Sequence, residues 1–201
     1  MNKVYYLLII VFIIASCNSE TLPYLGITEI DMDTNKEIKH TISSFSFVNQ
    51  DSNTITEDYL KGKITIVDFF FSTCPTICPE MTKNMKEVQQ KWLDEQTIQF
   101  LSHTVDPETD TPKKLKRYAK FFDIDTKNWN FVTGKKTELY DLGFYSYMVT
   151  TDEDDIAPGG FIHSSLFILV DKNLHIRGIY DGLEEEELKK LNTDLKLLIN
   201  E

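Results

Sequence analysis

Two cysteines four positions apart, Cys74 and Cys78, are the residues of this chain whose type and spacing best suit chemistry. They lie where an apolar segment ends and a helix is expected to begin. The free N–H groups and the dipole at a helix N-terminus stabilise a thiolate, so we expect the pKa of a thiol here to be lowered. A thiolate is both a nucleophile for disulfide exchange and a ligand for soft metals. The pair therefore predicts a redox site or a metal site.

The spacing bears on this choice but leaves both uses open. Three residues separate the cysteines, where thioredoxin-like oxidoreductases usually have two, and a disulfide remains sterically possible. Two thiolates alone suit linear copper(I), and a third ligand suits trigonal copper(I) or a more tetragonal copper(II) site. A structural zinc site needs four protein ligands. A purely structural disulfide is disfavoured, because closing so short a loop adds little stability.

Four histidines could supply a third ligand: His40, His103, His163 and His175. We expect His40 and His175 to be exposed, and His103, in a predicted strand, to be structural. His163 follows a Pro-Gly-Gly loop and directly precedes the apolar segment 164–170. In a thioredoxin-like sandwich that strand would begin beside the cysteine turn. His163 is therefore the favoured candidate, although its position alone does not make it a ligand.

The N-terminus has the layout of a bacterial lipoprotein signal. Val4 to Ala15 is almost wholly apolar after a single lysine, and it is short for a bilayer span. Ile14-Ala15-Ser16-Cys17 resembles the lipobox whose cysteine becomes the lipidated N-terminus. This predicts a signal peptide over residues 1–16, a lipid-anchored tether over 17–40 and an extracytoplasmic location at a membrane surface. A plain secretory signal or an uncleaved anchor are the alternatives.

The overall charge argues against some partners. The formal net charge is −11, and the acidic residues gather in clusters at 152–155 and 184–187. A chain this acidic is a poor candidate for binding nucleic acid through its surface. The clusters themselves are typical of solvated loops and helix ends.

The predicted elements alternate in a way that indicates an α/β fold. The expected strands are 64–71, 97–105, 129–132, 164–170 and 174–180, and the expected helices are 80–93, one from 112, a less regular one over 139–147, and 184–199. This order predicts a thioredoxin-like sandwich over residues 41–201, with a central mixed sheet flanked by helices and an N-terminal hairpin near 41–53. Met81 and Met85, at helical spacing, are expected in the core.

Three blocks resemble the SCO/SenC family. The first is Val67-Asp68-Phe69-Phe70-Phe71-Ser72-Thr73-Cys74-Pro75-Thr76-Ile77-Cys78-Pro79. The second is Val105-Asp106-Pro107-Glu108-Thr109-Asp110-Thr111-Pro112 with Leu115 and Tyr118, and the third is His163-Ser164 leading into 166–171. They occur in the family's order across residues 45 to 200. Helix capping alone would also explain the second block, and a place for Asp106 or Asp110 near a metal is only a hypothesis.

The resemblance implies a function as well as a fold. It implies one copper ion, as Cu(I) or Cu(II), bound by Cys74, Cys78 and His163, and delivery of that ion to the binuclear copper centre of cytochrome c oxidase or to another copper protein. Some members of the family instead reduce the oxidase subunit's cysteines, so a thiol–disulfide oxidoreductase is the alternative. We expect a binding protein rather than an enzyme. A peroxidase and a redox or copper sensor are further possibilities.

Overall fold

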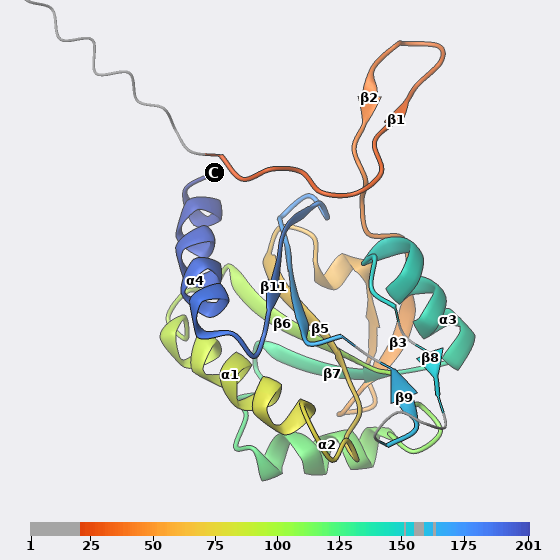
Figure 1. The fold of residues 1–201 in the computed structure, drawn as a ribbon, viewed down its shortest axis with the longest axis vertical. Helices are drawn as coiled ribbons and strands as arrows, with labels where there is room; N and C mark the ends of the chain where they lie inside the picture. Colours follow the sequence, from red (N-terminus) through yellow and green to blue (C-terminus); the bar gives the residue numbers. More distant parts are fainter. Residues whose placement is uncertain (1–20, 151, 155–158, 163) are drawn as a thin grey trace, which may run out of the picture.

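The structure is a computed structural model that describes residues 21–150, 152–154, 159–162 and 164–201 (Figure 1). Cys17 and the predicted signal peptide lie outside these residues. Within the described part of the chain, none of the helices combines the length and the apolar character that a membrane span needs.

A seven-stranded mixed sheet forms the centre of the domain, in the order β11-β10-β5-β6-β7-β3-β4. Three neighbouring strands, β5, β6 and β7, are parallel, and the remaining pairs are antiparallel. The bounds are β3 Ser46–Asn49, β4 Thr54–Thr56, β5 Ile64–Phe70, β6 Ile98–Thr104, β7 Trp129–Thr133, β10 Leu166–Val170 and β11 Ile176–Asp181. The expected thioredoxin-like sandwich with a mixed sheet is confirmed.

Helices cover both faces of the sheet. They are α1 Cys78–Lys91, α2 Pro112–Phe121, α3 Lys136–Asp141 and α4 Glu185–Asn200. α1 and α4 lie together on one face and α3 on the other, with α2 next to α1 (Figure 1). The hydroxyls of Thr82 and Tyr118, 2.7 Å apart, join α1 to α2. The helix expected over 139–147 is irregular, because α3 passes into a π-helical turn over Leu142–Ser146.

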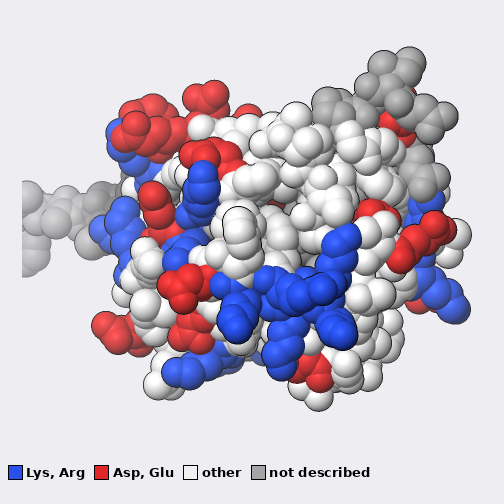
Figure 2. Space-filling view, turned by 90° about the horizontal axis from the view of Figure 1, so that it is seen from below, with Lys and Arg blue, Asp and Glu red and all other residues white. Residues whose placement is uncertain are grey.

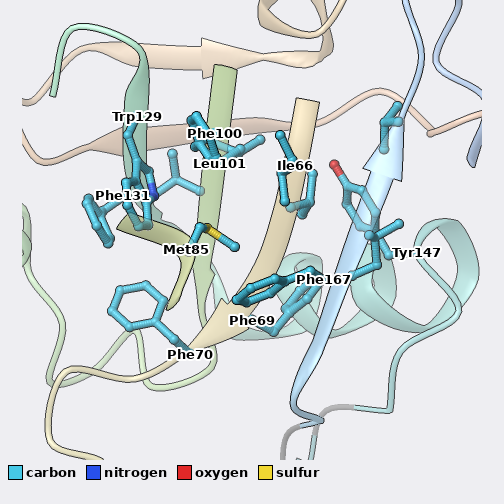
Figure 3. Close-up of a cluster of buried hydrophobic side chains, with 14 of the residues drawn as sticks. Ile66, Phe69, Phe70, Met85, Phe100, Leu101, Trp129, Phe131, Tyr147 and Phe167 are labelled. Carbon is cyan, nitrogen blue, oxygen red and sulfur yellow. The ribbon is translucent and has the colours of Figure 1, made fainter. Parts of the chain in front are cut away.

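The core surrounds β5, an interior strand of the sheet. Every residue of this strand is buried, as its nearly continuous apolar sequence predicts for a strand covered on both faces. Its side chains fill the core on both faces: Phe70 packs on Phe131, which stacks on Trp129, and Phe69 packs on Tyr147 (Figure 3). Met81 and Met85 are also fully buried, which confirms their expected place in the core.

The segment before the sheet is held against the domain. Arg177 donates hydrogen bonds to the carbonyl oxygens of Leu22 and Pro23, at 2.7 and 3.2 Å, and pairs with Asp171. The short strands β1 Glu29–Ile30 and β2 Glu37–Ile38 then form a small hairpin. Figure 1 shows this segment at the end of the molecule opposite the turn between β5 and α1.

The expected hairpin near 41–53 forms, but its first strand begins later than predicted. Ile42 and Phe45 are buried outside any strand. The backbone of Ile42 pairs with that of Leu174 instead, through a hydrogen bond of 2.9 Å from N–H to carbonyl oxygen.

Candidate metal centre

Both candidate cysteines lie in one turn, residues 72–79, which links the end of β5 to the start of α1 and is called here the cysteine turn. Cys74 is 8% exposed and Cys78 is fully buried, and neither is in a disulfide. Cys78 begins α1, and Pro79 occupies the first helical turn, where its missing N–H removes no hydrogen bond. The predicted position at a helix N-terminus is confirmed.

The expected lowering of the thiol pKa is wrong for Cys78. A side-chain hydrogen bond with Cys74 and burial both raise the pKa of this thiol, and the negative charge of Asp68 adds to the effect. A backbone hydrogen bond with Phe71 acts in the opposite direction and is outweighed. The helix N-terminus therefore does not decide the pKa of Cys78, because the thiol is desolvated and hydrogen-bonded to Cys74. A metal has to displace that proton in order to bind.

Asp110 fixes the cysteine turn from the next block of the sequence. Its carboxylate is fully buried and accepts hydrogen bonds from the backbone N–H of Ser72, at 2.9 Å, and from the hydroxyl of the same residue. The Thr104 hydroxyl donates a third, at 2.6 Å. Thr111, not Asp110, caps α2 by accepting from the N–H of Lys114. Asp110 is therefore a positioning residue for the turn, a role that the sequence alone did not reveal.

The segment that leads to residue 163 also lies on the cysteine turn. β9 Phe161–Ile162 pairs with β8 Asp152–Glu153. The ring of Phe161 packs on that of Phe71, with centroids 5.0 Å apart. A Cβ placed on Gly159 would lie 2.8 Å from the Phe71 ring and 3.1 Å from Pro75, so the backbone here passes close to the turn. His163 itself lies outside the described residues.

The other three histidines do not approach the turn through any described contact. His103 is fully buried among aromatic rings, including Phe69 at 5.1 Å, and burial lowers its pKa to about 3. Its expected buried, structural position is confirmed, but neither ring nitrogen has a hydrogen-bond partner among the described residues. His40 and His175 are half-buried rather than exposed, because His175 Nδ1 contacts the His40 carbonyl at 2.7 Å and His40 Nε2 contacts that of Ser146 at 2.7 Å. Among the described residues, no group of three His, Cys, Asp or Glu side chains is placed to hold a metal.

Comparison with known proteins relates the whole domain to one family. The sequence profile of the SCO1/SenC family matches residues 33–199. A solved structure of a SCO1/SenC family lipoprotein from Bacillus anthracis is 33% identical, with a TM-score of 0.74 over 80% of this chain and 95% of its own. BsSco, described as a member of the Sco family of cytochrome c oxidase assembly proteins with a disulfide switch, is 32% identical. Its TM-score is 0.71 over 79% of this chain and 93% of its own.

A third solved structure, yeast Sco1 with copper bound, is 26% identical, with a TM-score of 0.63 over 78% of this chain and 89% of its own. The match therefore extends from sequence to fold over nearly the whole domain. The chain belongs to the SCO1/SenC family.

Proposed function

We propose that this chain binds one copper ion through Cys74, Cys78 and His163 and delivers it to cytochrome c oxidase, where the binuclear copper centre is assembled. The observation that carries the proposal is the packing of the segment before residue 163 at the cysteine turn: Gly159 lies beside Pro75 of the turn, and Phe161 packs on Phe71 directly before it. Yeast Sco1, solved with copper, and BsSco, an oxidase assembly protein, are relatives with the same fold.

The donors fit copper. Two sulfurs and an imidazole form a soft ligand set that suits trigonal copper(I) or a more tetragonal copper(II) site. The thiols are nearly or fully buried, so bulk water has little access to the sulfur atoms. Each thiol releases its proton to solvent when it ligates the metal. A site of three protein ligands leaves room for an incoming thiolate of the acceptor, and copper can then move by ligand exchange.

The position of the N-terminal segment supports a role at a membrane surface. If Cys17 carries lipid, the chain is anchored on the extracytoplasmic side of a membrane. Arg177 holds the segment at Leu22 and Pro23 against the end of the domain opposite the cysteine turn. The turn would then face away from the anchor, toward the copper-bearing part of a neighbouring membrane enzyme.

The decisive variant for the ligand set is His163→Ala. We expect it to lower copper affinity by at least tenfold, because one of three ligands is lost, while dithiol oxidation and reduction continue. His175→Ala is the matched control, since His175 hydrogen-bonds at the opposite end of the domain, and it should keep copper. Competition with a copper(I) chelator measures both. Equal copper affinity of His163→Ala and the unmodified chain would reject the proposed site.

A thiol–disulfide oxidoreductase is the second candidate, favoured by the hydrogen bond between Cys74 and Cys78. The more exposed Cys74 would attack a disulfide of the oxidase subunit and form a mixed disulfide. That attack releases one client sulfur as a thiolate. Cys78 would then attack the Cys74 sulfur of the mixed disulfide and displace the other client sulfur, which leaves a reduced client and a Cys74–Cys78 disulfide. In that case His163→Ala would leave client reduction intact and copper would be dispensable.

A further inference from the structure

An apolar hollow of about 620 Å³ opens between α1 and α2, directly beside the cysteine turn. Aromatic side chains of Tyr118, Phe121 and Phe122 line it, and Ser72 and Pro79 of the turn complete its wall. Phe121 is 81% exposed, so an apolar ring faces solvent at the edge of the hollow. We call this hollow and its rim the α1–α2 groove.

The rim of the groove is basic in an otherwise acidic molecule. Lys83, Lys114 and Arg117 border the hollow. α2 carries five basic residues and no acidic ones in ten positions, although the chain as a whole has a net charge of −11. Figure 2 shows Lys and Arg gathered in one band on the face seen from the α2 side.

The chain neutralises this charge only in part. Lys83 pairs with Glu80 at 3.2 Å, with both side chains more than half exposed, so this ion pair contributes little. Lys114 lies 3.9 Å from Asp110, the residue that fixes the cysteine turn. Among the described residues, no acidic side chain forms an ion pair with Arg117. The groove therefore offers positive charge around an apolar pocket, which complements an acidic segment that carries an aromatic or aliphatic side chain.

We propose that the α1–α2 groove docks an acidic segment of the protein that receives the copper, with one apolar side chain of that segment in the hollow. This rests on the proposed function. Ser72 and Pro79 belong to both the groove and the cysteine turn, so a segment bound here brings its parent protein within reach of Cys74. A concave pocket suits an inserted side chain better than it suits a flat membrane surface.

The test measures binding of the copper-loaded full chain to the copper-free soluble domain of the oxidase subunit that carries the binuclear centre. Lys83→Glu/Arg117→Glu should weaken binding at least tenfold in low salt. Lys127→Glu/Lys196→Glu is the matched control: it makes the same change in net charge at exposed positions outside the groove, and it should stay within about twofold of the unmodified chain. Phe121→Ser should weaken binding in low and high salt alike, since it removes apolar contact.

The possible outcomes separate the alternatives. The docking proposal is overturned if the unmodified chain does not bind the domain, or if both double variants bind equally well or equally poorly. It is also overturned if Lys83→Glu/Arg117→Glu instead loses adhesion to vesicles that contain phosphatidylglycerol, or loses self-association, while it still binds the domain. Copper content is measured in the same samples. Loss of copper from the unmodified chain would count against the proposed function and not against the groove.

Discussion

Phe161 packs on Phe71 with ring centroids 5.0 Å apart, so a residue just before the block that begins at residue 163 lies on the residue directly before the cysteine turn. This contact joins two parts of the chain that are 90 positions apart in sequence. It means that the geometry of the proposed copper site depends on packing between β9 and the end of β5, and not on the three ligands alone.

Replacing Gly159 by alanine should disturb this packing. Gly159 and Gly160 both have positive φ, of 83° and 86°, so alanine is strained at either position by about 1 kcal/mol. Only at Gly159 would the new Cβ meet the Phe71 ring, at 2.8 Å. We expect Gly159→Ala to lower copper affinity several-fold, while Gly160→Ala keeps it. Competition titration against a copper(I) chelator compares the two, and equal affinities would show that this contact does not support the site.

Removing the Asp110 carboxylate should loosen the cysteine turn. Asp110→Ala leaves the N–H and hydroxyl of Ser72 and the hydroxyl of Thr104 without their acceptor, which costs about 2–4 kcal/mol of unfolding free energy. Copper affinity should fall about tenfold, as for other groups that orient ligands. Thr111→Ala removes only the cap of α2. It should lower the unfolding free energy by about 1 kcal/mol and leave copper affinity unchanged.

Urea unfolding measures the unfolding free energy, and competition with a copper(I) chelator measures copper affinity. Both are done at a temperature where each variant is folded. The outcome against this role would be an Asp110→Ala protein that is less stable but binds copper as tightly as Thr111→Ala does. Asp110 would then stabilise the fold without positioning the turn.

The sequence was sufficient for the architecture because the patterns of β5 and α4 are local. β5 is apolar at almost every position and α4 repeats leucine on one face, and both form within two residues of their expected bounds. The place of the two cysteines after β5 and the order of the elements along the chain followed from the same reasoning. The late start of β3 could not be predicted, because Ile42 is held by a backbone partner, Leu174, that is remote in sequence.

The electrostatics of the site were less predictable than its location. The helix N-terminus argued for a low pKa at Cys78, but the side chain is fully buried and shares a hydrogen bond with Cys74, and both effects raise the pKa. Burial and side-chain contacts depend on tertiary packing, which the spacing of two cysteines does not encode. The anchoring of Ser72 by Asp110 was missed for the same reason, since a capping role explained that aspartate equally well.

His103 should make the protein sensitive to acid. Burial lowers its pKa from the ordinary 6.5 to about 3, so between these pH values the unfolded chain binds more protons than the folded one. Its contribution to stability is complete above pH 6.5 and is lost as the pH falls toward 3. His103→Phe places another ring in this aromatic cluster. When the pH falls from 6.5 to 4.5, its unfolding free energy should drop by about 2 kcal/mol less than that of the unmodified chain.

Urea unfolding at the two pH values measures this difference, and the carboxylates common to both proteins cancel in the comparison. An identical loss of stability in His103→Phe and in the unmodified chain would mean that the histidine is already protonated, or already solvated, in the folded state.

Metal analysis and absorption spectroscopy of the reduced protein after copper(II) addition test most directly whether Cys74 and Cys78 bind copper together. We expect one copper per chain and a thiolate-to-copper(II) charge-transfer band. The band should be lost in Cys78→Ser and retained in Cys17→Ser, the variant that removes the remaining cysteine of the chain. A band of full intensity in Cys78→Ser, or no bound copper in the unmodified chain, would contradict this expectation.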